Sequence, residues 1–497
     1  MTNSLFLDAI LAPVVSHLGD ESAAFFIAGE SHSYKELASR ISSLRASIAL
    51  STDAARIFGL AIHDDLDTYA AIFALWMEGR AYVPLHPGQP LDRNRNIIGQ
   101  VGLRTVIDSQ PTSPYDELLD VIHTASLPEA ALNAGNWTDP GDDALAYILF
   151  TSGSTGEPKG VTISRGNIAS FMEAFWQTGI SISPEDRCLQ CFDLTFDVSV
   201  QSYLCALTRG ACVYTVPYGQ VKYLYAASLI NDSHITFGAM APSMLTYLRP
   251  YFDELDFSSL RQCILTAEAC PVTLMEELYR VAPKLEIFDF YGPTEATIYC
   301  TSYALSRTRP NKSLNGIISI GKPLPGMTGI IIDEDGNELL SGEKGELVVA
   351  GPQLTPGYWK NDEKNAASFF LRGGVRFYHT GDLCYKDEDG DIMYSGRIDQ
   401  QAKIQGFRVE LGEIEYHARA FFNQAVRVAA IAFENDKALT EIALFVEREP
   451  EDSRELEKYL RGKMPHYMIP TRFLYLPSFP LNKSEKLDRN ELKKKLL

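Results

Sequence analysis

The sequence predicts an α/β fold, with mainly parallel sheets in a large N-terminal domain and a small α+β domain at the C-terminus. A helical spacing of apolar residues at 33–50 is followed by a strand-like apolar run at 57–62. Such alternation is typical of parallel sheets whose strands are joined by helices. The chain has 497 residues, which is more than one hydrophobic core usually holds, so at least two domains are expected.

The last hundred residues have the pattern of a separate domain. A β-hairpin is expected at 401–410, and helices are expected at 411–422 and 453–463, with two strand-like runs among them. An amphipathic α+β unit of this size can fold independently. We therefore expect one domain over 1–398 and a second over 399–497.

Composition and charge exclude several classes of protein. A 45% hydrophobic and 22% charged composition is that of an ordinary soluble globular protein. The formal net charge of −19 argues against nucleic acid or an anionic membrane surface as the main partner. No apolar run reaches transmembrane length, and the N-terminus lacks the pattern of a signal peptide, so we expect a cytoplasmic protein.

The eight cysteines favour reduced core residues over a disulfide framework. Cys188 and Cys191 form a CxxC pair, for which zinc binding is the alternative. No second pair of ligands follows, and the neighbouring residues are apolar. We therefore expect both thiols in the core.

The stretch Tyr147–Val161, YILFTSGSTGEPKGV, predicts a buried strand that ends in a phosphate-binding loop. Its glycines allow close approach of the backbone, while its amides, hydroxyls and one ammonium group suit a polyphosphate. It is not a Walker loop, because Glu157 and Pro158 separate Gly156 from Lys159. The alternative is a flexible linker, which would rarely follow a buried strand. The expected phosphate ligands are Thr151, Ser152, Gly153, Ser154, Thr155, Gly156 and Lys159.

Further motifs follow in order along the chain, notably FDVS at 196–199, YGPTEAT at 291–297, YHTGD at 378–382 and LNKSEKLDR at 481–489. Together with the loop they resemble the adenylate-forming superfamily, which includes acyl-CoA synthetases, luciferases and amino-acid adenylation domains. The resemblance spans essentially the whole chain. It implies a small barrel, signalled by the motif at 345–358, at the end of the large domain, and a mobile C-terminal domain that turns about Asp399.

The resemblance implies ATP and Mg²⁺ as ligands. Tyr291 would offer its ring to adenine, Thr294 its hydroxyl to the α-phosphate, and Glu295 a hard oxygen ligand to Mg²⁺. Asp382 would accept hydrogen bonds from the ribose, and Arg397 would meet phosphate or ribose. Without the resemblance, the Gly-Asp pair at 381–382 would more often be a turn.

Asp197 distinguishes the substrate class. A carboxylate among apolar neighbours such as Phe192 and Phe196 is costly to bury unless a cation pairs with it. In the amino-acid-activating branch that the chain resembles, this Asp binds the α-ammonium group, and acyl and aryl substrates carry no such charge. The alternative is an Asp that caps a helix beginning near Ser199.

Lys486 matches the invariant lysine that, in the family, bridges the substrate carboxylate and the α-phosphate. Glu485 stands beside it where a glycine is usual, which puts the position of the lysine in doubt. Alternatively, Lys486 is one solvated charge of a basic tail. With Glu295, Thr294 and Arg397, Lys486 completes the expected catalytic set.

The motif alignment also predicts the amino-acid pocket. Phe290, Tyr299 and Thr266 are large for their positions, and the pocket has no charge besides its Asp and its Lys, so a small neutral side chain is expected. Glycine, alanine of either hand and proline remain open, because the start of the set resembles proline-selective pockets and its aromatic pair resembles glycine-selective ones. The full set is Asp197, Val198, Gln201, Ala239, Ile264, Thr266, Phe290, Ile298, Tyr299 and Lys486.

Two other motifs depart from the family pattern. His86 stands where an Asp is usual, and we expect a surface histidine there. Thr266-Ala267-Glu268 replaces the usual Gly-Gly-Glu, which narrows the space beside the substrate.

The implied function is activation of a small amino acid as aminoacyl-AMP, followed by transfer to the phosphopantetheine thiol of a separate carrier protein. This activity is similar to that of D-alanine:carrier-protein ligases and of adenylation domains of nonribosomal peptide synthetases. No carrier sequence follows the last motif, and the lysines at 493–495 could attract an acidic carrier. The alternatives are an aryl- or acyl-CoA ligase of the same fold, and a binding or regulatory protein that has lost activity.

Overall fold

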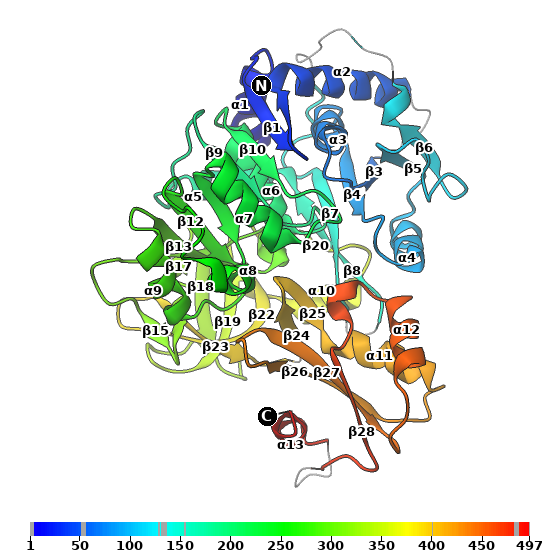
Figure 1. The fold of residues 1–497 in the computed structure, drawn as a ribbon, viewed down its shortest axis with the longest axis vertical. Coiled ribbons are helices and arrows are strands. Elements are labelled where there is room, and N and C mark those ends of the chain that lie inside the picture. Colours follow the sequence, from blue (N-terminus) through cyan, green and yellow to red (C-terminus); the bar gives the residue numbers. More distant parts are fainter. Residues whose placement is uncertain are drawn as a thin grey trace. The chain divides into compact units, whose positions relative to one another are not determined.

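The computed structural model describes residues 4–50, 56–127, 130, 137–153, 156–399, 401–481 and 487–496. The chain divides into two compact units, drawn in Figure 1. The first comprises 1–87, 101–149 and 160–398, and the second comprises 88–100, 150–159 and 399–497. The C-terminal stretch of the second unit begins at Asp399, the expected hinge residue.

A nine-stranded mixed sheet is the centre of the first unit. Six neighbouring strands, from β13 to β1 in the spatial order, pair in parallel, and antiparallel strands complete both edges. In spatial order the strands are β17 (Lys322–Pro323), β14 (Thr301–Ala304), β13 (Glu286–Tyr291), β12 (Gln262–Thr266), β11 (Phe237–Met240), β9 (Arg187–Gln190), β10 (Cys212–Thr215), β1 (Ala23–Ile27) and β2 (Glu30–Ser33).

Helices cover both faces of this sheet. Alternate strand residues enter two different cores, because successive side chains of a strand point to opposite faces. Ala239, Ile264 and Phe290 belong to one core, whereas Met240 and Leu265 belong to the other. The helices that follow the strands along the chain are α5 (Arg165–Phe175), α6 (Asp197–Leu207), α7 (Lys222–Ser233), α8 (Pro242–Leu248) and α9 (Val272–Val281).

A seven-stranded sheet leads to the phosphate loop. Its order is β20 (Gly357–Tyr358), β8 (Lys159–Ser164), β7 (Leu145–Thr151), β4 (Ala81–Leu85), β3 (Ile57–Ala61), β5 (Thr105–Asp108) and β6 (Asp120–His123). Helices α2 (Tyr34–Leu50) and α3 (Leu66–Met77) belong to the same part of the chain, and α3 is buried from Thr68 onwards. Its N-terminus is capped by Asp65, whose carboxylate accepts the Thr68 amide at 2.8 Å. Near its start the chain also forms a π-helix, η1 (Leu7–Leu11), and α1 (Ala12–His17).

A five-stranded antiparallel sheet completes the first unit in the region where a small barrel is expected. It consists of β18 (Thr328–Ile332), β19 (Gly345–Ala350), β22 (Val375–Lys386), β21 (Phe369–Arg372) and β23 (Ile392–Arg397). A short pair, β15 (Ser313–Leu314) and β16 (Ile317–Ile318), and helix α10 (Asp362–Ser368) lie nearby in the sequence. The α/β fold class predicted from the sequence is confirmed.

The second unit contains the expected C-terminal elements. The hairpin is β24 (Gln401–Ile404) and β25 (Phe407–Glu410), and a three-stranded sheet follows, with β26 (Val428–Glu434), β27 (Thr440–Glu447) and β28 (Arg472–Leu476). Apolar residues of α11 (Leu411–Phe421) and α12 (Arg454–Arg461) pack with these strands in one core. The unit also includes α4 (Leu91–Val101) and α13 (Arg489–Lys494).

All eight cysteines are free and buried, as expected. Burial raises the pKa of the Cys191 thiol to about 12 and that of Cys188 well above its ordinary value, which favours the protonated thiols expected in a core. No helix in the described part of the chain is long and apolar enough to cross a membrane.

Candidate active site

Asp197 is the first residue of α6 and is only 6% exposed. The N-cap of α6 is Phe196, and no side chain caps the helix, so the helix-cap alternative for Asp197 is wrong. The Thr294 side chain and the amides of Val198 and Ile298 lie close enough to the carboxyl to lower its pKa, which offsets part of the effect of burial. Its Oδ2 atom has no hydrogen-bond partner among the described residues.

Burial is the main reason that the pKa of the Asp197 carboxyl is raised to about 6. A buried carboxylate with one unpaired oxygen is energetically unfavourable unless a donor or a cation completes it. The Tyr147 hydroxyl, buried and also without a described partner, is close enough for the Asp197 charge to raise its pKa further. The unpaired oxygen of this carboxylate can therefore accept a hydrogen bond from a cationic donor.

The other predicted pocket residues that the structure describes are all buried. In the parallel register Ala239 pairs with Ile264 and Thr266 pairs with Phe290, so these side chains share one face of the sheet. Burial is the main cause of the raised pKa of Tyr299, to which the Asp197 charge contributes, and the Tyr299 hydroxyl donates to Oε1 of Gln201 at 3.3 Å. The eight residues, none more than 5% exposed, are Val198, Gln201, Ala239, Ile264, Thr266, Phe290, Ile298 and Tyr299.

The loop that carries Ile298 and Tyr299 has a constrained backbone. After the 3₁₀ turn η4 (Thr294–Ala296), Thr297 and Ile298 both have left-handed φ angles, of 56° and 70°. Non-glycine residues hold this conformation only where the surroundings enforce it. Gly292 permits the approach, because a Cβ atom there would lie 2.5 Å from the Ile298 carbonyl oxygen.

Gln353 supports this loop and was missed by the sequence analysis. Its Nε2 donates to the Tyr299 carbonyl at 2.6 Å, and its own carbonyl accepts the Thr297 hydroxyl at 2.5 Å. Gln353 is fully buried and lies within the motif at 345–358, which was interpreted only as a structural signature. Its position after Pro352 gave no sign of a contact with a loop more than fifty residues earlier.

Glu295, the expected Mg²⁺ ligand, is fully buried on η4. Its Oε1 accepts the Tyr358 hydroxyl at 2.7 Å, and its carbonyl accepts the Thr355 amide at 2.9 Å. A carboxylate oriented in this way is the hard, anionic donor that Mg²⁺ prefers, so the site fits the ion. The contact from Tyr358 was not foreseen, since the sequence analysis gave that residue no chemical role.

Asp382 and Arg397 face each other across the β22–β23 pair. Arg397 donates to Oδ1 of Asp382 at 2.9 Å, and the Tyr291 hydroxyl donates to Oδ2 through a short hydrogen bond. Three residues predicted to hold the nucleotide are therefore in direct contact. Both carboxylate oxygens that would accept the ribose hydroxyls already have partners.

In the second unit, carboxylates from the C-terminal stretch occupy the phosphate loop. The Gly153 amide donates to Oε2 of Glu413 at 3.1 Å, and the Ser152 hydroxyl accepts the Glu410 amide at 3.0 Å. Lys159 is 3.6 Å from Oε1 of Glu410. The Gly153 amide and the Lys159 ammonium, two of the expected anion-binding groups, thus face protein carboxylates.

Glu413 is fully buried, and burial raises the pKa of its carboxyl above the ordinary value. Arg93 forms an ion pair with Glu413 at 2.9 Å, which offsets part of the free-energy cost of burying the carboxylate charge. Gly156 has a φ angle of 84° and lies against the ring of Tyr416. A Cβ atom added at Gly156 would lie 2.2 Å from that ring, so the position favours glycine. The hydroxyl of Thr151 is buried and has no described partner.

Several predicted residues lie outside the described part of the chain. These are Ser154 and Thr155 of the phosphate loop, and Lys486 with the neighbouring Glu485. Their roles stay predictions. Asp399 is exposed, and its carboxylate accepts the Gln401 amide at 3.1 Å.

The two departures from the family pattern have structural counterparts. His86 is not a surface residue, because its side chain is only 11% exposed and pairs with Asp193 at 2.9 Å. An Asp at this position would face a like charge there, whereas a histidine forms a pair. Ala267 has φ of 69°, a left-handed conformation in which the usual glycine would be unstrained.

A cluster of three aspartates does not belong to this site. Asp387, Asp389 and Asp391 could hold a metal ion by their spacing, but the Lys312 ammonium already lies 2.6–2.7 Å from each.

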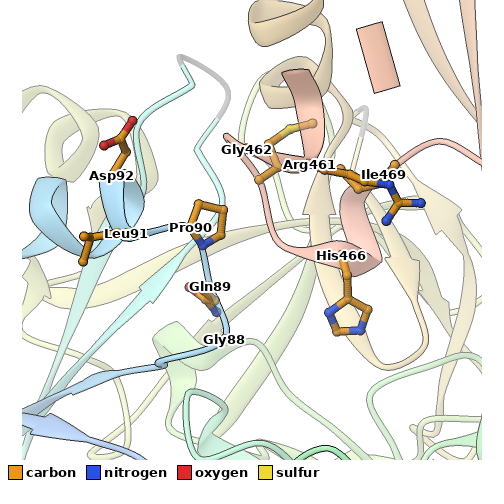
Figure 2. Close-up of a pocket in the computed structure, with 10 residues that line it drawn as sticks. Gly88, Gln89, Pro90, Leu91, Asp92, Arg461, Gly462, His466 and Ile469 are labelled. Atoms are coloured by element: carbon orange, nitrogen blue, oxygen red, sulfur yellow. The ribbon is translucent and has the colours of Figure 1, made fainter. Parts of the chain in front are cut away.

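A pocket of about 510 Å³ in the second unit is lined by 88–92 and by residues between Arg461 and Ile469 (Figure 2). Its lining contains none of the predicted site residues.

Comparison with known proteins places these motifs in context. A family described as AMP-binding enzyme matches residues 15–359. Tyrocidine synthase 3 of Brevibacillus parabrevis is 32% identical over 99% of this chain, which spans only 8% of that protein. The D-alanine–D-alanyl carrier protein ligase of Bacillus licheniformis is 30% identical over 96% of this chain and 97% of its own length.

A solved structure shows the same fold over the full length. The Vibrio cholerae adenylation domain AlmE, in complex with glycyl-adenosine-5'-phosphate, has a TM-score of 0.87 and 23% identity. The match covers 100% of this chain and 98% of that one.

Proposed function

Because this chain belongs to the family of AMP-binding enzymes, we propose that it activates a small amino acid with ATP and passes it to a carrier protein. The observation that carries the amino-acid assignment is the unpaired, buried Oδ2 of Asp197. An α-ammonium group supplies the missing donor and the missing positive charge at once. A fatty or aromatic acid supplies neither.

In the first step, a carboxylate oxygen of the amino acid attacks the α-phosphorus of ATP. The bond from that phosphorus to the oxygen bridging to the β-phosphate breaks, and pyrophosphate leaves. The Thr294 side chain lies close enough to Asp197 to lower the pKa of that carboxyl, which supports its proposed contact with the α-phosphate beside the amino acid. Lys486 is proposed to bridge the two reacting groups, which is electrostatic positioning.

Glu295 would hold Mg²⁺, which when bound neutralises charge on the phosphates. Asp382 would exchange its bonds from Arg397 and Tyr291 for the ribose hydroxyls, and Tyr291 would then lie against the adenine. Arg397 would be released to meet phosphate or ribose. The phosphate ligands of 151–159 are proposed on their loop chemistry.

In the second step, the thiol of a phosphopantetheine group attacks the carbonyl of the aminoacyl-AMP. A thioester forms, the bond between the carbonyl carbon and the phosphate oxygen breaks, and AMP leaves. Two relatives of nearly full length, at 30% and 28% identity, are D-alanyl carrier protein ligases, which supports a separate carrier as the acceptor. We propose that Asp399 is the hinge between the two steps, and that both occur in the cytoplasm.

ATP–pyrophosphate exchange tests the first step. The enzyme is incubated with each proteinogenic amino acid and D-alanine, and in parallel with pooled fatty and aryl acids. Exchange should depend on a small amino acid, and exchange with the carboxylic acids alone would identify an acyl- or aryl-CoA ligase. Absence of exchange with every substrate would instead favour a binding protein.

Loading assays test the second step. Candidate carrier proteins carrying phosphopantetheine are incubated with enzyme, ATP and the activated amino acid, and the mass of each carrier is measured. We expect the carrier to gain one aminoacyl group. Transfer to free coenzyme A, with none to any carrier, would contradict the proposed partner.

A further inference from the structure

We infer that Gln353 is a positioning residue, because its side-chain amide holds the loop that carries both the proposed Mg²⁺ ligand and part of the amino-acid pocket. This inference rests on the proposed function of Glu295 and of the pocket. Nε2 of Gln353 donates to the Tyr299 carbonyl at 2.6 Å. The same atom lies 3.4 Å and 3.5 Å from the carbonyl oxygens of Ala296 and Thr297. One amide group therefore faces three carbonyl groups of the same loop.

The backbone that Gln353 holds is strained. Thr297 and Ile298 both have left-handed φ angles, of 56° and 70°. Both residues are β-branched, which makes this conformation particularly unfavourable. Such residues keep it only where contacts from outside enforce it, and the bonds from Gln353 are contacts of that kind. Without them the loop can relax, and Glu295 and Tyr299 on either side would move with it.

The amide of Gln353 is unfavourable as a mere packing group. The side chain is fully buried, and its Oε1 atom has no hydrogen-bond partner among the described residues. A buried acceptor without a partner costs free energy, which a methionine of similar size would avoid. The amide must therefore contribute something that an apolar side chain cannot. The three carbonyl groups that face Nε2 identify this contribution as donation to the loop.

The segment that follows Gln353 holds the same loop at its other end. The Thr355 amide donates to the Glu295 carbonyl at 2.9 Å, and the Tyr358 hydroxyl donates to Oε1 of Glu295 at 2.7 Å. This segment is itself fixed, because Arg376 donates to the Thr355 carbonyl at 2.7 Å. One short segment therefore positions the metal ligand and the pocket loop together, and a change at Gln353 should affect both.

Gln353→Met tests this role, because methionine keeps the length of the side chain and removes its donors. We expect the dissociation constant for Mn²⁺, measured by electron paramagnetic resonance with a non-hydrolysable ATP analogue, to rise about tenfold or more. In pyrophosphate exchange, kcat/KM for the amino acid should fall by a similar factor. A loss of folded protein alone would lower the number of bound ions and leave their affinity unchanged.

Gln262→Met is the matched control. Gln262 is also buried, at the start of β12, where its amide bonds the backbone of Ser181 and Gly179. The control should lower the melting temperature and leave Mn²⁺ affinity and kcat/KM as in wild type. Thr297→Val removes a second contact, the hydroxyl that donates to the Gln353 carbonyl, and should raise the dissociation constant for Mn²⁺ as well.

The measurements separate this role from the proposed function. An unchanged Mn²⁺ affinity in Gln353→Met, or in Thr297→Val if the first variant does not fold, would overturn the positioning role. Wild-type enzyme that exchanges pyrophosphate with no amino acid would instead defeat the proposed function. The Mn²⁺ measurement would still decide the role of Gln353, because it needs no amino acid.

Discussion

At the scale of single residues, the raised pKa of Asp197 connects substrate binding with pH. The folded protein holds the carboxyl proton more tightly than the unfolded chain does, since the pKa rises from 3.8 to about 6. Unfolding therefore becomes easier as pH rises between these values, by on the order of 3 kcal/mol for this one group. The free energy of unfolding of the ligand-free protein is therefore lower at neutral pH than at pH 4 by this amount.

Asp197→Asn should therefore stabilise the ligand-free protein at pH 8 while abolishing amino-acid activation. The amide has nearly the shape of the carboxyl and keeps an oxygen near Thr294 and the amides of Val198 and Ile298, but the buried charge is gone. Thermal unfolding at pH 8 and pH 4 measures the effect, and the gain over wild type should be present at pH 8 and small at pH 4. A destabilised variant at pH 8 would show that the wild-type carboxylate already has a compensating cation.

The same pKa predicts the pH profile of the reaction. The α-ammonium group stays charged below pH 8, so only ionisation of Asp197 limits binding on the acid side. We expect kcat/KM for the amino acid to fall about tenfold per pH unit below pH 6. The acid limb of the kcat profile should lie at a lower pH than that of the kcat/KM profile, because the bound ammonium group favours the ionised carboxylate and so lowers its pKa. Equal acid limbs for kcat and kcat/KM would contradict this assignment.

The sequence predicted the burial of Asp197 from its apolar neighbours, and it predicted the amino-acid pocket as a set. It could not predict which carboxylate oxygen is unpaired, because one partner, Thr294, comes from almost a hundred residues away. The tyrosines were also underestimated. Tyr358 and Tyr299 act through hydroxyl contacts that residue spacing does not encode.

At the scale of elements, the strand β20 controls how the metal ligand is held. It pairs antiparallel with β8, with Tyr358 opposite Val161, and so the tyrosine hydroxyl meets Glu295. The helices expected at 33–50, 411–422 and 453–463 are found within two residues of those limits. The positions of these helices could be predicted from the periodicity of apolar residues. The pairing of the two-residue strand β20 could not be predicted in this way, because so short a segment has no periodic pattern.

Tyr358→Phe should weaken Mg²⁺ binding without unfolding the protein. The ring remains to pack against Phe369, and only the hydroxyl that orients Glu295 is lost. We expect the dissociation constant for Mn²⁺, measured by electron paramagnetic resonance with a non-hydrolysable ATP analogue, to rise about tenfold. Tyr378→Phe, on a neighbouring tyrosine that also contacts Phe369, is the control and should bind as wild type does. Unchanged binding in the Tyr358 variant would show that Glu295 needs no such support.

Helix α11 carries the carboxylate that occupies the phosphate loop. Glu413→Gln keeps the shape of the side chain but removes a negative charge next to the Gly153 amide. The KM for ATP should fall about threefold to tenfold, since the nucleotide no longer competes with an anion. The melting temperature should fall as well, because Arg93 loses its charged partner. Glu457→Gln, in an exposed pair with Arg461, should change neither quantity, and an unchanged KM in the Glu413 variant would contradict the competition.

At the scale of the whole molecule, each compact unit is assembled from segments that are separated in the sequence. Residues 88–100 and 150–159 belong with the C-terminal stretch, and the pair of Arg93 and Glu413 joins positions 320 residues apart. The sequence predicted a change of domain near 398 from motifs alone. It could not assign the two earlier segments, because their membership depends on contacts and their composition is ordinary.

Lys486→Ala should separate the two half-reactions. Adenylation should lose transition-state stabilisation on the order of several kcal/mol, whereas transfer from supplied aminoacyl-AMP to the carrier should be nearly unaffected. Single-turnover assays of each step measure both rates. Normal adenylation by the variant would mean that Glu485 has displaced the lysine from its expected role.

The buried hydrogen bonds that join Tyr299, Gln201 and Cys205 also bear on how such an enzyme changes its substrate over evolutionary time. Gln201 and Cys205 lie on α6 and Tyr299 lies in the loop after η4, so a mutation at one of them leaves a polar group without its partner at another. Stepwise mutation must then pass through impaired intermediates. The eight described residues of the predicted pocket besides Asp197 nevertheless all lie between Val198 and Tyr299. Recombination of that one gene segment exchanges the entire network together and avoids the impaired intermediates.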